Sequence, residues 1–370
     1  MHILIASDKF KGSLTAVEAN AAIAGGLRKG SPKTLVIESI PIADGGDGLV
    51  ATLVAATGGT TESIEVTGPL GAPTNAIVGY LPGKETAVIE MAEASGITLL
   101  PTEQLNPTLA STYGTGEMIQ HVISRGCKKI IMGIGGSATN DGGTGMASAL
   151  GFQFLDSHSN PLENLPAQLL QVDSITEPNN LTLPEIIIAC DVTNPLLGPD
   201  GCTRIYGPQK GITAEDLEEH ESKLSHLATL CGEKGRKAAC APGAGAAGGL
   251  GFGSIVFLGA ELTPGFDLVA ELLGLKAAVQ SADLIITGEG KLDAQSLLGK
   301  GPGSLARLAR EQGKPVIAFC GGTDNLCEST LFDEIVEISD TRLTLEENMD
   351  RGFDLLASNA EQFAGRALPK

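Results

Sequence analysis

The first 30 residues, MHILIASDKFKGSLTAVEANAAIAGGLRKG, decide the fold. The apolar run Ile3 to Ala6 predicts a buried strand, and the polar segment Ser7 to Leu14 predicts a loop. A helix is expected from Thr15 to about Lys29, because Thr15 and Glu18 have the spacing of a capping box. This stretch therefore predicts one strand-loop-helix unit.

The next segment repeats this unit. Leu35 to Ile40 predicts a second strand, Asp44 to Gly48 a glycine-rich loop, and Leu49 to Ala56 an apolar helix. Two such units in succession indicate the parallel sheet of an α/β protein.

The middle of the chain has a different pattern, which indicates a second domain. Hairpin strands are expected at Thr61 to Val66, Ala76 to Leu81 and Ala87 to Met91, because Gly and Pro turns separate them. The α/β pattern returns with the strands Lys129 to Ile134 and Glu185 to Cys190. We also expect a short strand in the uncharged stretch before residue 260, at residues 254–258.

The last part of the chain alternates strand and helix again, with the clearest strands at Leu284 to Thr287 and Val316 to Cys320. We therefore expect two α/β domains. One has a doubly wound, mainly parallel sheet built from both chain ends, residues 1–66 and 285–370. The other is an inserted mixed-sheet domain of residues 67–284.

Composition limits the partners of the protein. Its 370 residues include 44 Asp and Glu against 25 Lys and Arg, a net charge of -19. Such a charge repels nucleic acids and anionic membrane surfaces, so neither is an expected partner. The seven cysteines form no C-x-x-C pair and no export signal is seen, which favours reduced thiols and a cytoplasmic location. Whether the chain forms a homo-oligomer stays open.

The loop with the most glycine and polar residues is Gly133 to Gly145, GIGGSATNDGGTG, which follows a predicted strand. Paired glycines let backbone N–H groups converge on an anion, and hydroxyl and amide side chains add neutral donors. A tight strand-to-helix connection, with glycines needed only for positive φ, is the alternative. The donors of this candidate phosphate cradle are Gly135, Gly136, Ser137, Thr139 and Asn140.

Three lysines stand on loops that follow predicted strands. Lys9 and Lys11 lie in the first loop of the chain and Lys291 in the last such loop. In an acidic protein, cations at these positions could neutralise the oxygens of a transferred phosphoryl group. The alternative for each is a solvated surface side chain. Arg204 and Lys210 are weaker candidates.

Acidic side chains occupy loops of the same kind. Asp44 and Asp47 surround two glycines and could share a magnesium ion, although Asp47 could equally cap the following helix. Asp191 follows a strand with a buried pattern and suits proton abstraction from a substrate hydroxyl. The alternative for Asp191 is a bond to its own turn through Asn194. Glu289 is a further acidic position, with a solvated turn residue as its alternative.

Absent motifs narrow the chemistry. The chain has no G-x-x-x-x-G-K-[ST], no G-x-S-x-G and no H-E-x-x-H, which excludes a P-loop, the usual hydrolase elbow and a zincin. Residues 243–248 match G-x-G-x-x-G, but no convincing strand precedes them. Close helix packing or a phosphate turn is therefore favoured over a dinucleotide site.

Together these loops resemble the bacterial glycerate kinase family of type 1, over nearly the whole chain. The segments that carry the resemblance are Ser7 to Leu14, Asp44 to Gly48, Tyr113 to Glu117, Gly135 to Gly145, Cys190 to Leu196 and Thr287 to Asp293. The resemblance implies two α/β domains with the site in a cleft. It also implies transfer of the ATP γ-phosphoryl group to D-glycerate with magnesium. The product in most characterised relatives is 2-phosphoglycerate, and 3-phosphoglycerate stays open here.

Our hypothesis assigns the roles as follows. Asp191 takes the hydroxyl proton, and Lys9 and Lys291 assist catalysis by balancing charge. Asp44 and Asp47 bind magnesium. The residues that join the glycine-loop donors in substrate or phosphate binding are Lys11, Ser13, Asn194 and Glu289. Two other functions stay open: a different small hydroxy-acid phosphotransferase, and a non-catalytic regulator that binds anions.

Overall fold

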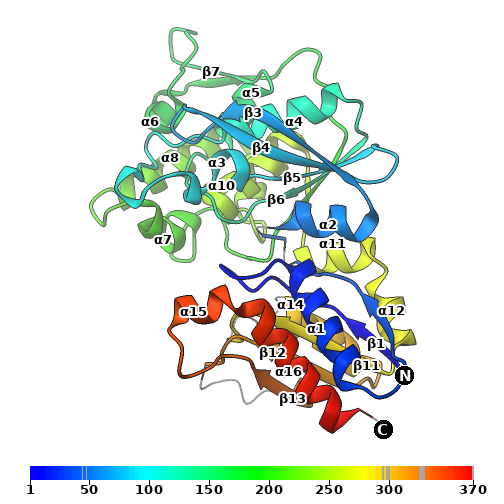
Figure 1. The fold of residues 1–370 in the computed structure, drawn as a ribbon. Coiled ribbons are helices and arrows are strands. Elements are labelled where there is room, and N and C mark those ends of the chain that lie inside the picture. Colours follow the sequence, from blue (N-terminus) through cyan, green and yellow to red (C-terminus); the bar gives the residue numbers. More distant parts are fainter. Residues whose placement is uncertain (44, 47, 294–295, 297–300, 325–329, 369–370) are drawn as a thin grey trace. The chain divides into compact units, whose positions relative to one another are not determined.

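The computed structural model describes residues 1–370 except 44, 47, 294–295, 297–300, 325–329 and 369–370. Its contacts divide the chain into an end unit, residues 1–44 and 266–370, and a middle unit, residues 45–265 (Figure 1). The sequence suggested divisions at 66/67 and 284/285 instead. The difference arises because the strand Thr60–Thr67 pairs within the middle unit and the helix Leu275–Ser281 packs in the end unit.

The end unit contains a five-stranded parallel sheet with the order β13-β12-β11-β1-β2. Its strands are β1 (His2–Ile5), β2 (Val36–Ser39), β11 (Leu284–Glu289), β12 (Val316–Cys320) and β13 (Glu334–Glu337). The chain order runs outward in both directions from the neighbours β1 and β11, which confirms the predicted doubly wound sheet. The switch point, where α/β sheets bind ligands, therefore lies between the carboxyl ends of β1 and β11.

Helices cover both faces of this sheet. They are α1 (Ala16–Gly30), α11 (Gly265–Leu272), α12 (Leu275–Ser281), α14 (Gly301–Glu311), α15 (Leu345–Asp350) and α16 (Gly352–Ala367). Ile3 and Ile5 of β1 pack with residues of α1 and α16, which lie side by side in Figure 1. Leu4 and Ala6 face the other side and pack with α12 and α14. Because both faces are covered, β1 reads as a continuous apolar run.

The predicted capping box at the start of α1 is confirmed. The Thr15 hydroxyl accepts a hydrogen bond from the Glu18 N–H at 3.2 Å, and the Thr15 N–H donates to the Glu18 carboxylate at 2.9 Å. The bond from the Thr15 N–H also lowers the pKa of Glu18.

The middle unit contains a six-stranded mixed sheet with the order β10-β9-β6-β5-β4-β3. Its strands are β3 (Thr60–Thr67), β4 (Pro73–Tyr80), β5 (Thr86–Glu90), β6 (Lys129–Gly133), β9 (Glu185–Ala189) and β10 (Glu261–Thr263). The antiparallel pairs β3-β4 and β4-β5 confirm the predicted hairpins, and β5, β6, β9 and β10 are parallel. A separate hairpin joins β7 (Gln153–Leu155) and β8 (Ser174–Thr176). The predicted mixed-sheet α/β fold is thus confirmed.

Helices and short helical turns surround this second sheet. The helices are α2 (Leu49–Thr57), α3 (Ala92–Ser95), α4 (Tyr113–Ser124), α5 (Thr144–Ala149), α6 (Leu165–Gln168), α7 (Cys202–Tyr206), α8 (Leu217–Leu230), α9 (Gly232–Ala239) and α10 (Ala246–Gly253). The short turns are η1 (Ile97–Leu99), η2 (Thr102–Gln104), η3 (Leu169–Gln171), η4 (Pro208–Lys210) and η5 (Ser254–Leu258). In the part of the chain that the structure describes, no helix is long and apolar enough to cross a membrane.

The strand expected at residues 254–258 is wrong, because this segment is a turn of π-helix that continues α10. Phe257 and Leu258 are buried in the core of the middle unit, as the apolar pattern required. The apolar run here is only four residues long, 255–258, and a run this short does not distinguish a strand from a buried helix. The pattern therefore indicated burial but not conformation.

Candidate active site

Two neighbouring strands of the middle unit end in predicted site loops. β6 leads into residues 134–143 and β9 leads into residues 190–195. Since β6 and β9 are parallel neighbours, both loops leave the same edge of the sheet. The structure therefore brings the glycine-rich loop and the loop of Asp191 to one edge of the middle unit.

The loop after β6, residues 134–143, which we call the β6 loop, keeps polar donors in a buried setting. Ser137, Thr139 and Asn140 are 6%, 0% and 4% exposed. Gly136 has a φ of 71°, which a residue with a side chain would adopt only at a cost. Within the described residues, the N–H groups of Gly135, Gly136, Ser137, Thr139 and Asn140 have no hydrogen-bond acceptor, and the Thr139 hydroxyl has no partner. Gly135 is half-buried and Gly136 is exposed, so their N–H groups are open to a ligand, whereas the buried donors of Ser137, Thr139 and Asn140 would normally be satisfied within the protein. The loop therefore has the chemistry of an anion site.

Asp141 anchors the far end of the β6 loop. Its fully buried carboxylate accepts hydrogen bonds from the Thr112 N–H and hydroxyl at 2.9 and 2.8 Å. It also accepts from the N–H groups of Gly143 and Gly145, at 3.0 and 3.2 Å. Burial raises the pKa of Asp141 despite these bonds. The sequence prediction missed this anchor, although an Asp directly before Gly-Gly in a loop was a usable signal.

Lys210 supports the β6 loop from inside the protein. Its side chain is 2% exposed, and its Nζ donates to the Ser137 hydroxyl and to the Thr139 carbonyl, the latter at 2.7 Å. Burial lowers the pKa of Lys210 to about 8. The sequence marked Lys210 only as a weak ligand candidate, because its partners lie 71 and 73 residues earlier in the chain.

The second glycine turn, residues 243–249, packs between the two loops. A Cβ on Gly245 would overlap the Pro195 carbonyl oxygen, and one on Gly248 would overlap the Thr139 carbonyl oxygen. Gly248 also has a φ of 67°. The glycines of the G-x-G-x-x-G match therefore permit close packing of this turn against the loops that follow β6 and β9. Close packing was one of the two interpretations that the sequence favoured, the other being a phosphate turn.

Of the two predicted site residues that follow β9, Asp191 has an exposed side chain and Asn194 is hydrogen-bonded within the fold. Asp191 is exposed, and its Oδ1 accepts a hydrogen bond from the Gly265 N–H at 2.7 Å. Asn194 donates through Nδ2 to the Asp200 carbonyl at 2.8 Å, and its Oδ1 accepts from the Tyr206 hydroxyl at 2.7 Å. Both Asn194 bonds hold its own turn and α7, so the fold already uses this side chain.

The predicted magnesium ligands Asp44 and Asp47 lie outside the described residues. The helix that follows them, α2, is capped by Glu90, a residue that the sequence prediction missed. Its buried carboxylate accepts from the N–H groups of Gly48 and Val50 at 2.9 and 2.8 Å. Across the described part of the chain, no group of three or more His, Cys, Asp or Glu side chains could hold a metal ion.

In the end unit, the loops after β1 and β11 meet at the switch point of the sheet. The Asp8 N–H donates to the Gly288 carbonyl at 2.8 Å, and a Cβ on Gly290 would lie 3.1 Å from the backbone nitrogen of Lys11. The structure thus brings the loop that carries Lys9 and Lys11 beside the end of β11, where Glu289 and Lys291 lie.

The side chains of these end-unit loops are mostly accessible. Lys9 is half-buried, Lys11 is exposed, and Lys291 is 59% exposed and forms an ion pair with Asp324 at 2.8 Å. The hydrogen bond with Asp324 raises the pKa of Lys291. Ser13 donates its hydroxyl to the Met349 carbonyl, so this predicted binding residue connects its loop to α15.

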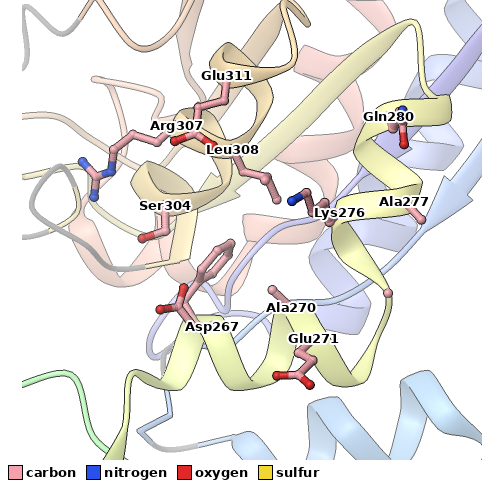
Figure 2. Close-up of a pocket in the computed structure, with 12 residues that line it drawn as sticks. Asp267, Ala270, Glu271, Lys276, Ala277, Gln280, Ser304, Arg307, Leu308 and Glu311 are labelled. Atoms are coloured by element: carbon pink, nitrogen blue, oxygen red, sulfur yellow. The ribbon is translucent and has the colours of Figure 1, made fainter.

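A surface pocket of about 740 Å³ in the end unit lies among α11, α12 and α14. Figure 2 shows acidic Glu271 and Glu311 and basic Lys276 and Arg307 around it. None of the predicted site residues that the structure describes lines this pocket, and its mixed charges do not select an anion.

The two sheets and their strand-end loops define an α/β protein with anion-binding geometry at a sheet edge. A profile of the glycerate kinase family matches residues 3–368, so the chain belongs to the glycerate kinase family and is a kinase.

Named relatives agree with this family. The chain is 41% identical to a glycerate kinase from Halalkalibacterium halodurans, over 98% of this chain and 97% of the relative. It is 43% identical to glycerate 2-kinase from Escherichia coli, over 88% and 87% of the two chains. A crystal structure of a glycerate kinase 2 candidate from Salmonella typhimurium has a TM-score of 0.87 and 39% identity, covering 98% of this chain and 97% of that one.

Proposed function

We propose that this chain is a glycerate kinase of type 1 that transfers the γ-phosphoryl group of ATP to the 2-hydroxyl of D-glycerate. The products are 2-phosphoglycerate and ADP. The Escherichia coli relative, whose name specifies phosphorylation at position 2, supports the choice of hydroxyl. The observation that carries the proposal is the set of five N–H groups in the β6 loop that lack acceptors among the described residues, those of Gly135, Gly136, Ser137, Thr139 and Asn140.

In this proposal the β6 loop holds ATP phosphates. Backbone N–H groups of Gly135, Gly136 and Thr139 suit phosphate oxygens because they are fixed donors that need no reorganisation. The Thr139 hydroxyl adds a neutral donor. The Asn140 amide donates one N–H to the Thr203 hydroxyl at 3.1 Å, and its second N–H adds another. Donors of this kind bind an anion without adding positive charge to an acidic protein.

Asp191 serves as the base in the proposed reaction. The substrate hydroxyl oxygen forms a bond to the γ-phosphorus, the bond to the β,γ-bridging oxygen breaks, and ADP leaves. The hydroxyl proton passes to the carboxylate of Asp191, whose Oδ1 is oriented by the Gly265 N–H. Lys9, Lys11 and Lys291 balance the charge of phosphate and carboxylate groups, and Glu289 contributes to substrate binding. Ser13 and Asn194, whose side chains are already bonded within the fold, contribute to binding by fixing the loops that carry them.

A magnesium ion at Asp44 and Asp47 remains part of the proposal as a prediction from sequence. Carboxylate oxygens are the ligands that Mg²⁺ prefers, and the bound ion would neutralise phosphate charge. We assign no step to the ion, because these two residues lie outside the described part of the chain.

The test is phosphorus NMR of the product formed from D-glycerate and ATP by the purified protein. We expect the resonance of 2-phosphoglycerate together with ADP. A 3-phosphoglycerate product would correct the position of transfer. Turnover only with other small hydroxy acids would replace the substrate, and tight ATP binding without turnover of any such acid would favour the regulator.

A further inference from the structure

The contacts of Lys210 determine the direction of a hydroxyl proton in the β6 loop. An ammonium group has only donors, so Ser137 must accept the bond from Lys210 through its Oγ. The proton of the Ser137 hydroxyl is then left to donate elsewhere. Among the described residues it has no acceptor.

The charge of Lys210 is also unusual for a buried lysine. Lys223 is as deeply buried, and it forms an ion pair with Glu219 at 2.7 Å. Within the described chain Lys210 forms no ion pair, and its two acceptors are both neutral. The charged or titratable groups that act on it from neighbouring segments are Asp141 and Cys202. A buried cation without a contacting carboxylate directs its positive potential at the loop it supports.

We propose that Lys210 is a positioning residue of the β6 loop. Its ammonium group holds Ser137 and Thr139 from inside, so that the Ser137 hydroxyl and the adjacent N–H groups face an anionic ligand. The identity of that anion as an ATP phosphate rests on the proposed function.

The first experiment compares Lys210→Met with the matched control Lys223→Met. We expect the Lys210 variant to weaken ATP binding at least tenfold by calorimetry, with the KM for D-glycerate changed less than threefold. The control keeps ATP affinity within twofold. The unfolding temperature of the Lys210 variant should change little, because removing a buried charge is favourable while Ser137 and the Thr139 carbonyl each lose a donor. Unchanged ATP affinity in a folded Lys210→Met protein overturns the proposal.

A second experiment uses Lys210→Arg, which keeps the charge and serves if the Met variant does not fold. In the wild type we expect the KM for ATP to rise as the pH passes about 8, where Lys210 loses its proton. Cys202, whose pKa is raised to about 12, stays protonated over this range. Arginine does not titrate here, so the alkaline rise should disappear in the Arg variant. A rise that persists would assign the effect to Asp141 or another group and overturn the role of Lys210.

Calorimetry with ATP separates this proposal from the proposed function. If the wild type binds ATP but phosphorylates no glycerate, the proposed function fails, while the affinity of the Lys210→Met variant still tests the loop. If the wild type is an active kinase and both variants bind ATP equally well, only the role of Lys210 fails. A wild type that does not bind ATP overturns both.

Discussion

The β6 loop of the middle unit and the loops after β1 and β11 in the end unit are built differently. The β6 loop uses backbone N–H groups, buried hydroxyls and one internal cation, Lys210. The end-unit loops carry their positive charge on the half-buried Lys9 and the exposed Lys11 and Lys291, and Lys291 is already paired with Asp324.

This difference separates fixed from adaptable recognition of an anion. Backbone and buried side-chain donors keep their geometry and carry no net charge of their own, so they are little affected by salt. Exposed lysine side chains can move with a transferred phosphoryl group. Salt weakens their attraction to the phosphate, and carboxylates such as Asp324 compete for them. We expect the middle unit to set nucleotide affinity and the end unit to set its salt dependence.

The largest effect is expected for Asp191→Asn, which tests whether chemistry can be separated from nucleotide binding in the middle unit. We expect kcat to fall by about 10² to 10⁴, the usual contribution of a general base. ATP affinity should stay within twofold, because Asn can still accept the bond from the Gly265 N–H. Steady-state kinetics and calorimetry measure the two quantities, and an intact kcat would reject Asp191 as the base.

The packing of the β6 loop is tested by Gly248→Ala. A Cβ here overlaps the Thr139 carbonyl, and the φ of 67° is strained for alanine, so we expect a loss of about 3 kcal/mol or more in unfolding free energy. Gly58→Ala is the control, because Gly58 has a φ of 72° but no atom within 4 Å of its added Cβ. The control should lose about 1 kcal/mol. Equal losses in urea unfolding would show that backbone strain alone matters.

The adaptable side of the comparison is tested by Lys9→Met. We expect kcat to fall by about 10², the effect of removing one electrostatic donor. In about 1 M salt, where the Debye length is ~3 Å, the difference from wild type should shrink. Lys33→Met, an exposed lysine at the opposite edge of the sheet, is the control and should keep wild-type kinetics. A salt-independent deficit would mean that Lys9 acts by contact at short range.

The smallest effect is expected for Lys291→Met on stability. Asp324 raises the pKa of Lys291, so the pair stabilises the fold below the ordinary lysine value of 10.5 and loses this effect as the pH rises through the raised pKa. Because the pair is exposed, the unfolding temperature at pH 7 should stay unchanged within error. A clear drop in the unfolding temperature at pH 7, which disappears as the pH rises through the raised pKa of Lys291, would show a stronger pair than its exposure suggests.

The sequence predicted the sheets because continuous apolar runs and glycine loops are local signals. β1, β6 and β12 follow their predicted strands closely, and the loops after β1 and β6 carry predicted site residues. The conformation predicted for residues 254–258 was wrong, because a buried strand and a buried helical turn have the same pattern in a short apolar run.

The partners of buried polar residues could not be predicted from the sequence. Lys210 finds Thr139 across 71 positions, and Glu90 finds the start of α2 across 42 positions. Such pairs depend on which loops the completed sheet brings to one edge. No local pattern around Lys210 distinguishes it from a solvated lysine.

The strand order of the end unit bears on how the chain folds as it is made. β1 pairs with β11 about 280 positions later, and the glycines of α1 that contact α16 would clash with it if they carried side chains. During synthesis, the first 44 residues therefore cannot complete their sheet until β11 has been made. Residues 45–265 form a continuous stretch, so their unit can fold before the rest of the chain is made. The middle unit, which holds the β6 loop, can thus complete its fold before the sheet of the end unit is complete.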